Sequence, residues 1–137
     1  MRYGLEVIAV PVTDIDRAKA FYQQLGWRLD VDTSPAPDIR IVQFTPPDSD
    51  ASILIGRGFP MGEPGSLRGA QLVVKDIDEA RDDLRGRGID CGDVFHWEPG
   101  GLVPGPDPTR HDYGSYLRFA DPDGNEWLVQ EVPSRDR

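Results

Sequence analysis

The chain has 137 residues, enough for one domain or for two half-domains that share a core. Its 15 basic and 24 acidic residues give a formal net charge of −9. This charge argues against nucleic acid or an anionic membrane as a partner, since either would need a basic patch. The single cysteine, Cys91, excludes an internal disulfide. No apolar run approaches the ~20 residues of a membrane span and no signal-peptide pattern opens the chain, so we expect a cytoplasmic protein.

The first half predicts a strand, a helix and three further strands. The apolar, β-branched run Leu5–Val12 predicts the first strand, and Thr13 or Asp14 then predicts the N-cap of a helix. Apolar residues recur at helical spacing as far as Leu25, and Gly26 is a stop signal. The three strands that follow are predicted at Trp27–Thr33, Ile39–Thr45 and Ala51–Gly56.

The second half predicts the same order of elements after a linker rich in glycine and proline at residues 57–68. A strand at Ala70–Val74 precedes a helix capped by Asp76 that ends near Arg87. Three strands are predicted within residues 89–96, 113–120 and 126–132. We therefore expect a first βαβββ module at residues 1–56, a second at residues 69–132 and a short tail at residues 133–137.

The two halves repeat each other in sequence. The stretch VTDIDRAKAFYQQLG recurs as VKDIDEARDDLRGRG 62 residues later (12 to 74), and FTPPD recurs as FADPD 75 residues later (44 to 119). The second half therefore carries 13 extra residues, the difference between 75 and 62. They fall in a glycine- and proline-rich segment, residues 96–113, which we expect to be a long loop. Such a loop in one copy is either an added functional element or a tolerated insertion.

The head V-x-D-I-D-R-A-x-x-F-Y-x-x-L-G-W at residues 12–27 and the tail F-x-D-P-D-G-N-x-W at residues 119–127 resemble the vicinal-oxygen-chelate superfamily. This superfamily includes glyoxalase I, the extradiol dioxygenases and the bleomycin-resistance proteins. The resemblance covers roughly residues 4–132. It implies an α+β fold of two paired βαβββ modules, whose sheets face each other around a concave cavity within one chain or across a dimer.

Metal-dependent members of that superfamily place ligands on the first and fourth strand of each module. Carried over to this sequence, the positions are Val7, Ile53, Gly69 and Leu128. None of these side chains offers the carboxylate, imidazole or thiolate donor that a divalent ion needs. The resemblance is therefore to a metal-free, cofactor-free branch, without the usual chemistry of glyoxalase I or the extradiol dioxygenases.

Strand alternation predicts which side chains line the cavity. From the strands we expect Gln43, Ile53, Ile55, Gln71, Tyr116, Arg118, Glu126 and Leu128. From the long loop we add three residues: Trp97 and Tyr113 to stack on a flat ligand or a cation, and His96 as an acid or base.

Three alternatives remain open for these residues. Arg118 and Glu126 could pair with each other across their hairpin, and Trp97 could cover the edge of the core. A metal site built from His96, Glu98 and His111 is also possible in principle.

These residues predict a metal-free protein of the bleomycin-resistance type that binds an aromatic or amphipathic small molecule. Sequestration of an antibiotic or metabolite, and hence antibiotic resistance, is the function that fits such a pocket. The alternative is a metal-independent lyase or isomerase that uses Glu126, Tyr116 or His96 as acid or base. We also expect a homodimer, because one small module can hardly cover the apolar residues of its sheet face alone.

Overall fold

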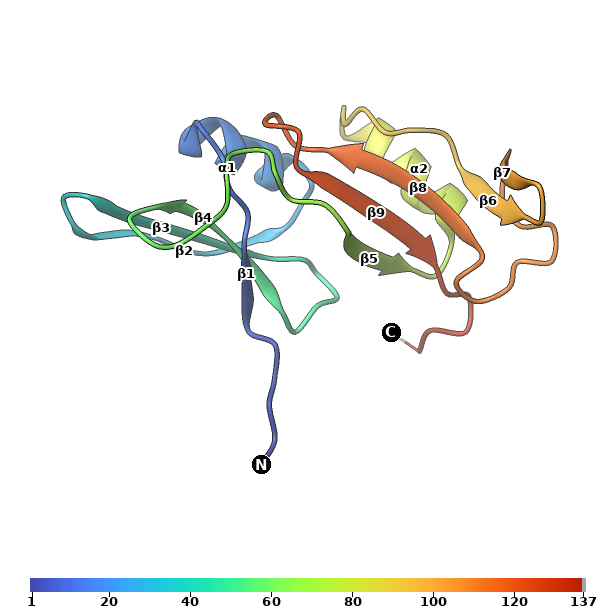
Figure 1. Ribbon diagram of the computed structural model, residues 1–137, viewed down its shortest axis with the longest axis horizontal. Helices are drawn as coiled ribbons and strands as arrows, with labels where there is room; N and C mark the ends of the chain where they lie inside the picture. The colour runs from blue at the N-terminus through green and yellow to red at the C-terminus, as the bar shows by residue number, and fades with distance from the viewer. Residues whose placement is uncertain (137) are drawn as a thin grey trace. The chain divides into compact units, whose positions relative to one another are not determined.

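The computed structural model describes residues 1–136, so Arg137, the last residue of the expected tail, lies outside the described part. The chain forms two compact units. The first consists of Met1–Leu67 and the turn Asp121–Asn125, and the second of Arg68–Ala120 and the chain from Glu126 onward. Each unit has one sheet and one helix, which confirms the predicted α+β class (Figure 1). Neither helix among residues 1–136 is long and apolar enough to cross a bilayer.

The first sheet has four strands in the order β1-β4-β3-β2. These are β1 (Val7–Ala9), β2 (Arg28–Ala36), β3 (Ile39–Thr45) and β4 (Ser52–Arg57). Only β1 and β4 run parallel. Helix α1 (Ile15–Gln24) begins where predicted, because the Asp14 side chain accepts a hydrogen bond of 3.0 Å from the Arg17 amide. β2 extends three residues beyond its predicted end and includes Pro35, which an edge strand tolerates.

The turn Asp121–Asn125 completes the core of the first unit. Tyr22 of α1 is fully buried and donates a hydrogen bond of 2.9 Å from its hydroxyl to Asp121. The amide of Asn125 donates to the carbonyl of Pro11 at 2.8 Å and to Asp121 at 2.8 Å. These bonds satisfy buried polar groups that would otherwise destabilise the fold.

The second sheet has five strands in the order β5-β9-β8-β6-β7. The strands are β5 (Ala70–Val74), β6 (Phe95–Glu98), β7 (Gly101–Pro104), β8 (Ser115–Ala120) and β9 (Glu126–Glu131), and helix α2 spans Ile77–Gly86. The first four strands in this order repeat the arrangement of the first sheet, and β7 is an addition at one edge. The helix cap at Asp76 and the strand at β5 lie where predicted.

Part of the expected loop 96–113 is a β-hairpin instead. β6 begins only at Phe95, since the preceding residues contribute a single isolated bridge between Cys91 and Phe119. β6 then pairs with β7 around a two-residue turn at Pro99 and Gly100. Two apolar runs separated by such a turn are a hairpin signal, which the abundance of glycine and proline obscured.

The predicted facing of β4 is wrong by one residue. Phe44 pairs with Ile53, and its ring packs 6.0 Å from that of Tyr22 in α1. Ile53 and Ile55 therefore lie on the face of the first sheet that α1 covers, where they are 5% and 0% exposed, and not on the opposite face. The cause is the turn length: Phe44 pairs with a residue nine positions later, whereas Phe119 pairs with Trp127, eight positions later. A shift of one residue moves every side chain of a strand to the other face, so Leu54 is the counterpart of Leu128.

Candidate functional site

The face of the second sheet opposite α2, here called the open face, carries most of the predicted site residues. Arg118 of β8 pairs in register with Leu128 of β9, and Leu128 pairs with Gln71 of β5. Residues paired in register point to the same side of a sheet. The structure thus brings together five predicted residues: Gln71, Tyr116, Arg118, Glu126 and Leu128. The alternate residues are buried on the α2 side: Leu117, Phe119, Trp127 and Val129.

Phe95 is the centre of a cluster on the open face. Its ring lies edge-on to Trp97 at 6.1 Å and 5.6 Å from the ring of Tyr116. The guanidinium of Arg118 lies over the same ring, 4.7 Å from its centroid. We call Phe95, Trp97 and Tyr116 the aromatic platform, and Arg118 lies beside it. Trp97 is 57% exposed whereas Phe95 is 7% exposed, so the platform presents aromatic surface on a packed base.

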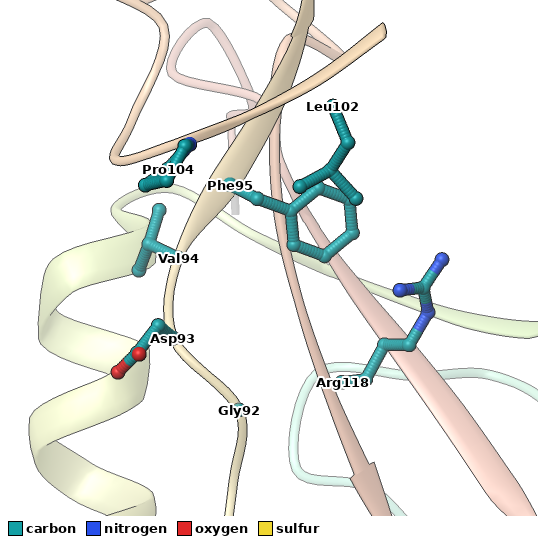
Figure 2. A pocket seen from close by; sticks show the side chains of 7 residues that line it. All are labelled: Gly92, Asp93, Val94, Phe95, Leu102, Pro104 and Arg118. Atoms are coloured by element: carbon teal, nitrogen blue, oxygen red, sulfur yellow. The ribbon is translucent and has the colours of Figure 1, made fainter.

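Two hollows lie beside Arg118. The first has a volume of about 390 Å³ and is lined by Gly92, Asp93, Val94, Phe95, Leu102, Pro104 and Arg118. Figure 2 shows Phe95, Leu102 and Arg118 on one side of the β6 backbone, and Val94 and Asp93 on the other. The second hollow, about 270 Å³, is lined by Arg68, Gly69, Arg118, Glu126, Trp127 and Leu128. Because Arg118 lines both hollows, a small molecule in either one would contact this residue.

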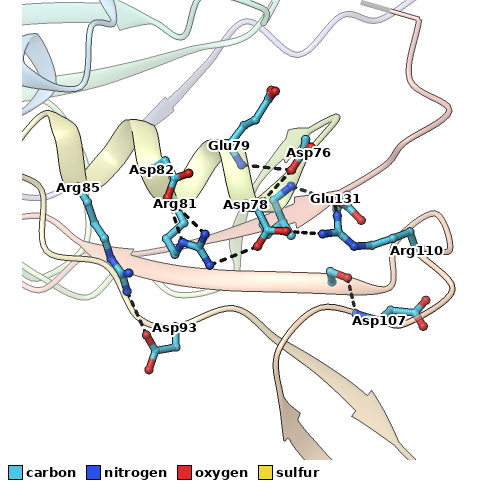
Figure 3. Close-up of polar contacts among 12 residues, drawn as sticks. Asp76, Asp78, Glu79, Arg81, Asp82, Arg85, Asp93, Asp107, Arg110 and Glu131 are labelled. Carbon is cyan, nitrogen blue, oxygen red and sulfur yellow. Dashed lines mark hydrogen bonds and ion pairs between the residues drawn. The ribbon is translucent and has the colours of Figure 1, made fainter.

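The acidic groups around the platform are already paired. Glu126 forms an ion pair of 2.7 Å with Arg68. Asp93 forms one of 3.0 Å with Arg85 (Figure 3). The guanidinium of Arg118 makes no ion pair or hydrogen bond with any of residues 1–136. The alternative that Arg118 and Glu126 pair across the hairpin is therefore wrong.

His96 does not join the platform. It alternates with Phe95 and Trp97 along β6, so it points to the other face, and it is 5% exposed. Its Nδ1 lies 2.7 Å from the carbonyl of Gly105 and its Nε2 lies 2.8 Å from the carboxylate of Glu98. Both neighbours are acceptors, so the ring satisfies both only when it is protonated. The Gly105 carbonyl, followed by Glu98, accordingly raises the pKa of His96 above its ordinary value.

The two histidines contact different carboxylates. His111 is exposed, and its Nδ1 lies 2.6 Å from Asp107. The backbone amide of His111, followed by its side chain, lowers the pKa of Asp107 to about 2. No group of three or more metal-ligating side chains occurs among residues 1–136, so the geometry lends no support to a site from His96, Glu98 and His111.

The segment between β7 and β8 is anchored to the helix side of the unit. Arg110 has a positive φ of 53° and forms ion pairs with Asp78 and, at 2.6 Å, with the fully buried Glu131 (Figure 3). Tyr113, with φ of 63°, donates its amide hydrogen to the Glu131 carbonyl at 2.8 Å. Its own carbonyl accepts a hydrogen bond from the Tyr116 hydroxyl. The side chain of Tyr113 is exposed, and its backbone is connected to the platform through Tyr116.

On the first sheet, Gln43 pairs with Leu54 and lies on the face opposite α1. Its amide donates a hydrogen bond of 3.4 Å to Asp30, which also accepts one from the Thr45 hydroxyl. The Thr45 bond is the main cause of the lowered pKa of Asp30. The Thr45 and Ser52 hydroxyls lie 2.6 Å apart, and Arg28 donates to Asp30 at 2.6 Å, so five polar side chains form one network that the sequence did not suggest.

The metal-ligand positions of the superfamily do not fit a metal in this chain. With the corrected register they are Val7, Leu54, Gly69 and Leu128. Aliphatic side chains and glycine provide no donor atom for a divalent ion. The corrected register puts Leu54 at the position assigned to Ile53, and leucine is also aliphatic.

Comparisons with known proteins agree with this architecture. Residues 4–129 match the family model described as the glyoxalase/bleomycin resistance protein/dioxygenase superfamily. TnmS3, an antibiotic binding protein from Streptomyces sp. CB03234, shares 31% identity over 96% of this chain and 97% of its own, with a TM-score of 0.72. A glyoxalase/bleomycin resistance protein from the same organism shares 32% identity over 93% and 100%, with a TM-score of 0.69.

A superfamily member from Sphaerobacter thermophilus DSM 20745 shares 26% identity over 95% of this chain and 98% of its own, with a TM-score of 0.72. No curated protein matches the sequence.

Proposed function

Because the chain belongs to the glyoxalase/bleomycin resistance protein/dioxygenase superfamily, we propose that it is a metal-free protein that binds and sequesters a small aromatic or amphipathic molecule. The site is the open face of the second sheet. An antibiotic or a related metabolite is the class of ligand that we assign to it.

The aromatic platform is the observation that carries this proposal. Trp97 presents more than half of its surface to solvent while its ring packs perpendicular to that of Phe95. Rigid aromatic side chains beside an apolar hollow give a flat molecule stacking area at little conformational cost. The description of TnmS3 as an antibiotic binding protein supports the same class of function, at 31% identity over nearly the whole chain.

The polar groups near the platform favour binding over acid–base catalysis. Glu126 is held by Arg68 and lies beside the second hollow. His96 points away from the platform, with both ring nitrogens engaged by Gly105 and Glu98. A lyase or isomerase of the kind considered above needs an acid or base that can reach its substrate.

We further propose that the protein is a homodimer in which a second copy covers part of the apolar surface. Exposed apolar side chains include Val31 on the first sheet and Leu102 beside the platform. Self-association is the common way in which a small domain covers such surface.

Fluorescence titration tests the binding proposal. A panel of flat aromatic compounds should quench tryptophan emission saturably, because Trp97 is exposed whereas Trp27 and Trp127 are buried. The matched control is Trp97→Phe, which keeps a stacking ring and should bind the same compounds while the quenchable emission is lost. Failure of every compound to quench the wild-type protein would contradict the proposal.

A further inference from the structure

We propose that Arg118 selects for ligands that carry an anionic group on or beside an aromatic ring, such as an aromatic carboxylate or sulfonate. This inference rests on the proposed function and narrows its ligand class. Arg118 would act as the specificity-determining residue of the open face.

The position of the guanidinium suits this role. It lies 4.7 Å from the centroid of the Phe95 ring, and Arg118 is a lining residue of both hollows. A guanidinium over a ring keeps its N–H groups in its own plane, where they can still donate two parallel hydrogen bonds to a carboxylate. A ligand could therefore stack on the platform and bond to Arg118 at the same time.

The pairing of the neighbouring charges leaves Arg118 as the cation available to a ligand. Arg68 on the second hollow is bound to Glu126, and Arg85 is bound to Asp93 at the rim of the first. The Arg118 guanidinium has no such partner within the described part of the chain.

The net charge of the protein sharpens the inference. At −9 the chain as a whole repels anions, so an anionic ligand would need a local cation to bind here. Screening limits the reach of distant charges to about 8 Å at physiological salt, and the two carboxylates that line the hollows, Glu126 and Asp93, are paired with Arg68 and Arg85.

A purely structural role for Arg118 is the competing explanation. In that case the side chain would only cover Phe95, and its removal would affect neutral and anionic ligands equally. The test must therefore compare two probes with the same aromatic skeleton.

Suitable probes are 1-anilinonaphthalene-8-sulfonate, which is anionic, and N-phenyl-1-naphthylamine, its neutral counterpart without the sulfonate. Both gain fluorescence in apolar surroundings, so their affinities can be measured by titration of the full chain. Four proteins are compared: the wild type, Arg118→Gln, Arg118→Lys and Trp97→Ala. Near-ultraviolet circular dichroism reports whether each variant is folded.

The wild type should bind the sulfonate roughly ten- to hundredfold more tightly than the neutral probe, the scale of a hydrogen bond to a charged group. Arg118→Gln should abolish this preference, because it should weaken the sulfonate at least roughly tenfold more than it weakens the neutral probe. Arg118→Lys should keep part of the preference, because it keeps the charge but loses the planar fork.

If Arg118→Gln lowers the affinity of both probes equally, or of neither, Arg118 does not determine specificity. The proposed function would still stand in that case if Trp97→Ala weakens the binding of both probes. If neither probe binds, or if Trp97→Ala changes neither affinity, the proposed function fails and this inference fails with it.

Discussion

Replacing Trp97 by alanine should separate binding from stability. The side chain is 57% exposed, and its one aromatic contact among the described residues is the edge-on packing against Phe95 at 6.1 Å. Stacking of a ligand ring on an aromatic side chain contributes about 1–3 kcal/mol, so Trp97→Ala should weaken binding of a flat aromatic ligand by roughly 5- to 150-fold. Trp97→Phe should recover most of that loss.

The same change should cost less stability than a core substitution. Less than half of the Trp97 surface is buried, so at about 25 cal/mol per Å² of buried apolar area the loss should stay below roughly 3 kcal/mol. Trp127→Ala is the matched control. That residue is 5% exposed and stacked 6.4 Å from Phe119, so its removal should cost about 3–5 kcal/mol.

Two measurements decide the outcome. Probe fluorescence gives the dissociation constants, and thermal unfolding followed by circular dichroism gives the melting temperatures. A melting temperature for Trp97→Ala that falls as far as that of Trp127→Ala, with unchanged affinity, would contradict the reasoning. Trp97 would then cover the core edge, and the binding site would lie elsewhere on the open face, around Gln71 and Tyr116.

Four further predictions follow from particular contacts. Tyr22→Phe should lower the free energy of unfolding by about 1.5–3 kcal/mol, since it removes a buried hydrogen bond to Asp121; chemical denaturation measures this, and the exposed Tyr3→Phe should change nothing. NMR titration should give His96 a pKa above 6.5, and Glu98→Gln should lower that pKa. Protonated His96 then stabilises the fold fully below pH 6.5, and this stabilisation is lost as the pH rises through the pKa of the folded state. A measured pKa at or below 6.5 would refute this. Elemental analysis should find no stoichiometric divalent metal, and about one zinc, nickel, manganese or iron ion per chain would contradict the proposed metal-free state. Light scattering at micromolar concentration should give about twice 15.2 kDa, and the monomer mass would exclude the homodimer.

The sequence was most informative where local signals agree. Asp14 and Asp76 mark the two helix starts because short carboxylates cap exposed backbone amides, and the structure confirms both. On the second sheet, strand alternation places Tyr116 and Arg118 of β8 on the same face as Glu126 and Leu128 of β9, and the pairing of the two strands agrees.

The errors arose where one residue of turn length matters. The turn before Ser52 is one residue longer than its counterpart before Glu126, so aligning the repeats by their prolines put Ile53 on the wrong face. A pattern of consecutive apolar residues, Ile53 to Ile55, gave no independent signal of the face because both faces are apolar there.

The centre of the platform was missed for a different reason. Phe95 lies two residues before Trp97, so the same alternation places both on one face once β6 and its hairpin are recognised. That Arg118 lies over Phe95 depends on the pairing of β6 with β8, and a register between distant segments is not readable from either strand alone.

Chemical-shift mapping tests the central claim most directly. Titration of the ¹⁵N-labelled protein with 1-anilinonaphthalene-8-sulfonate should give saturable shifts centred on the Trp97 indole and on the amides of Phe95, Tyr116 and Arg118. Amides under α2, such as that of Val129, should move much less. Saturable shifts centred instead on the helix-covered faces, or shifts that never saturate, would contradict a binding site on the open face of the second sheet.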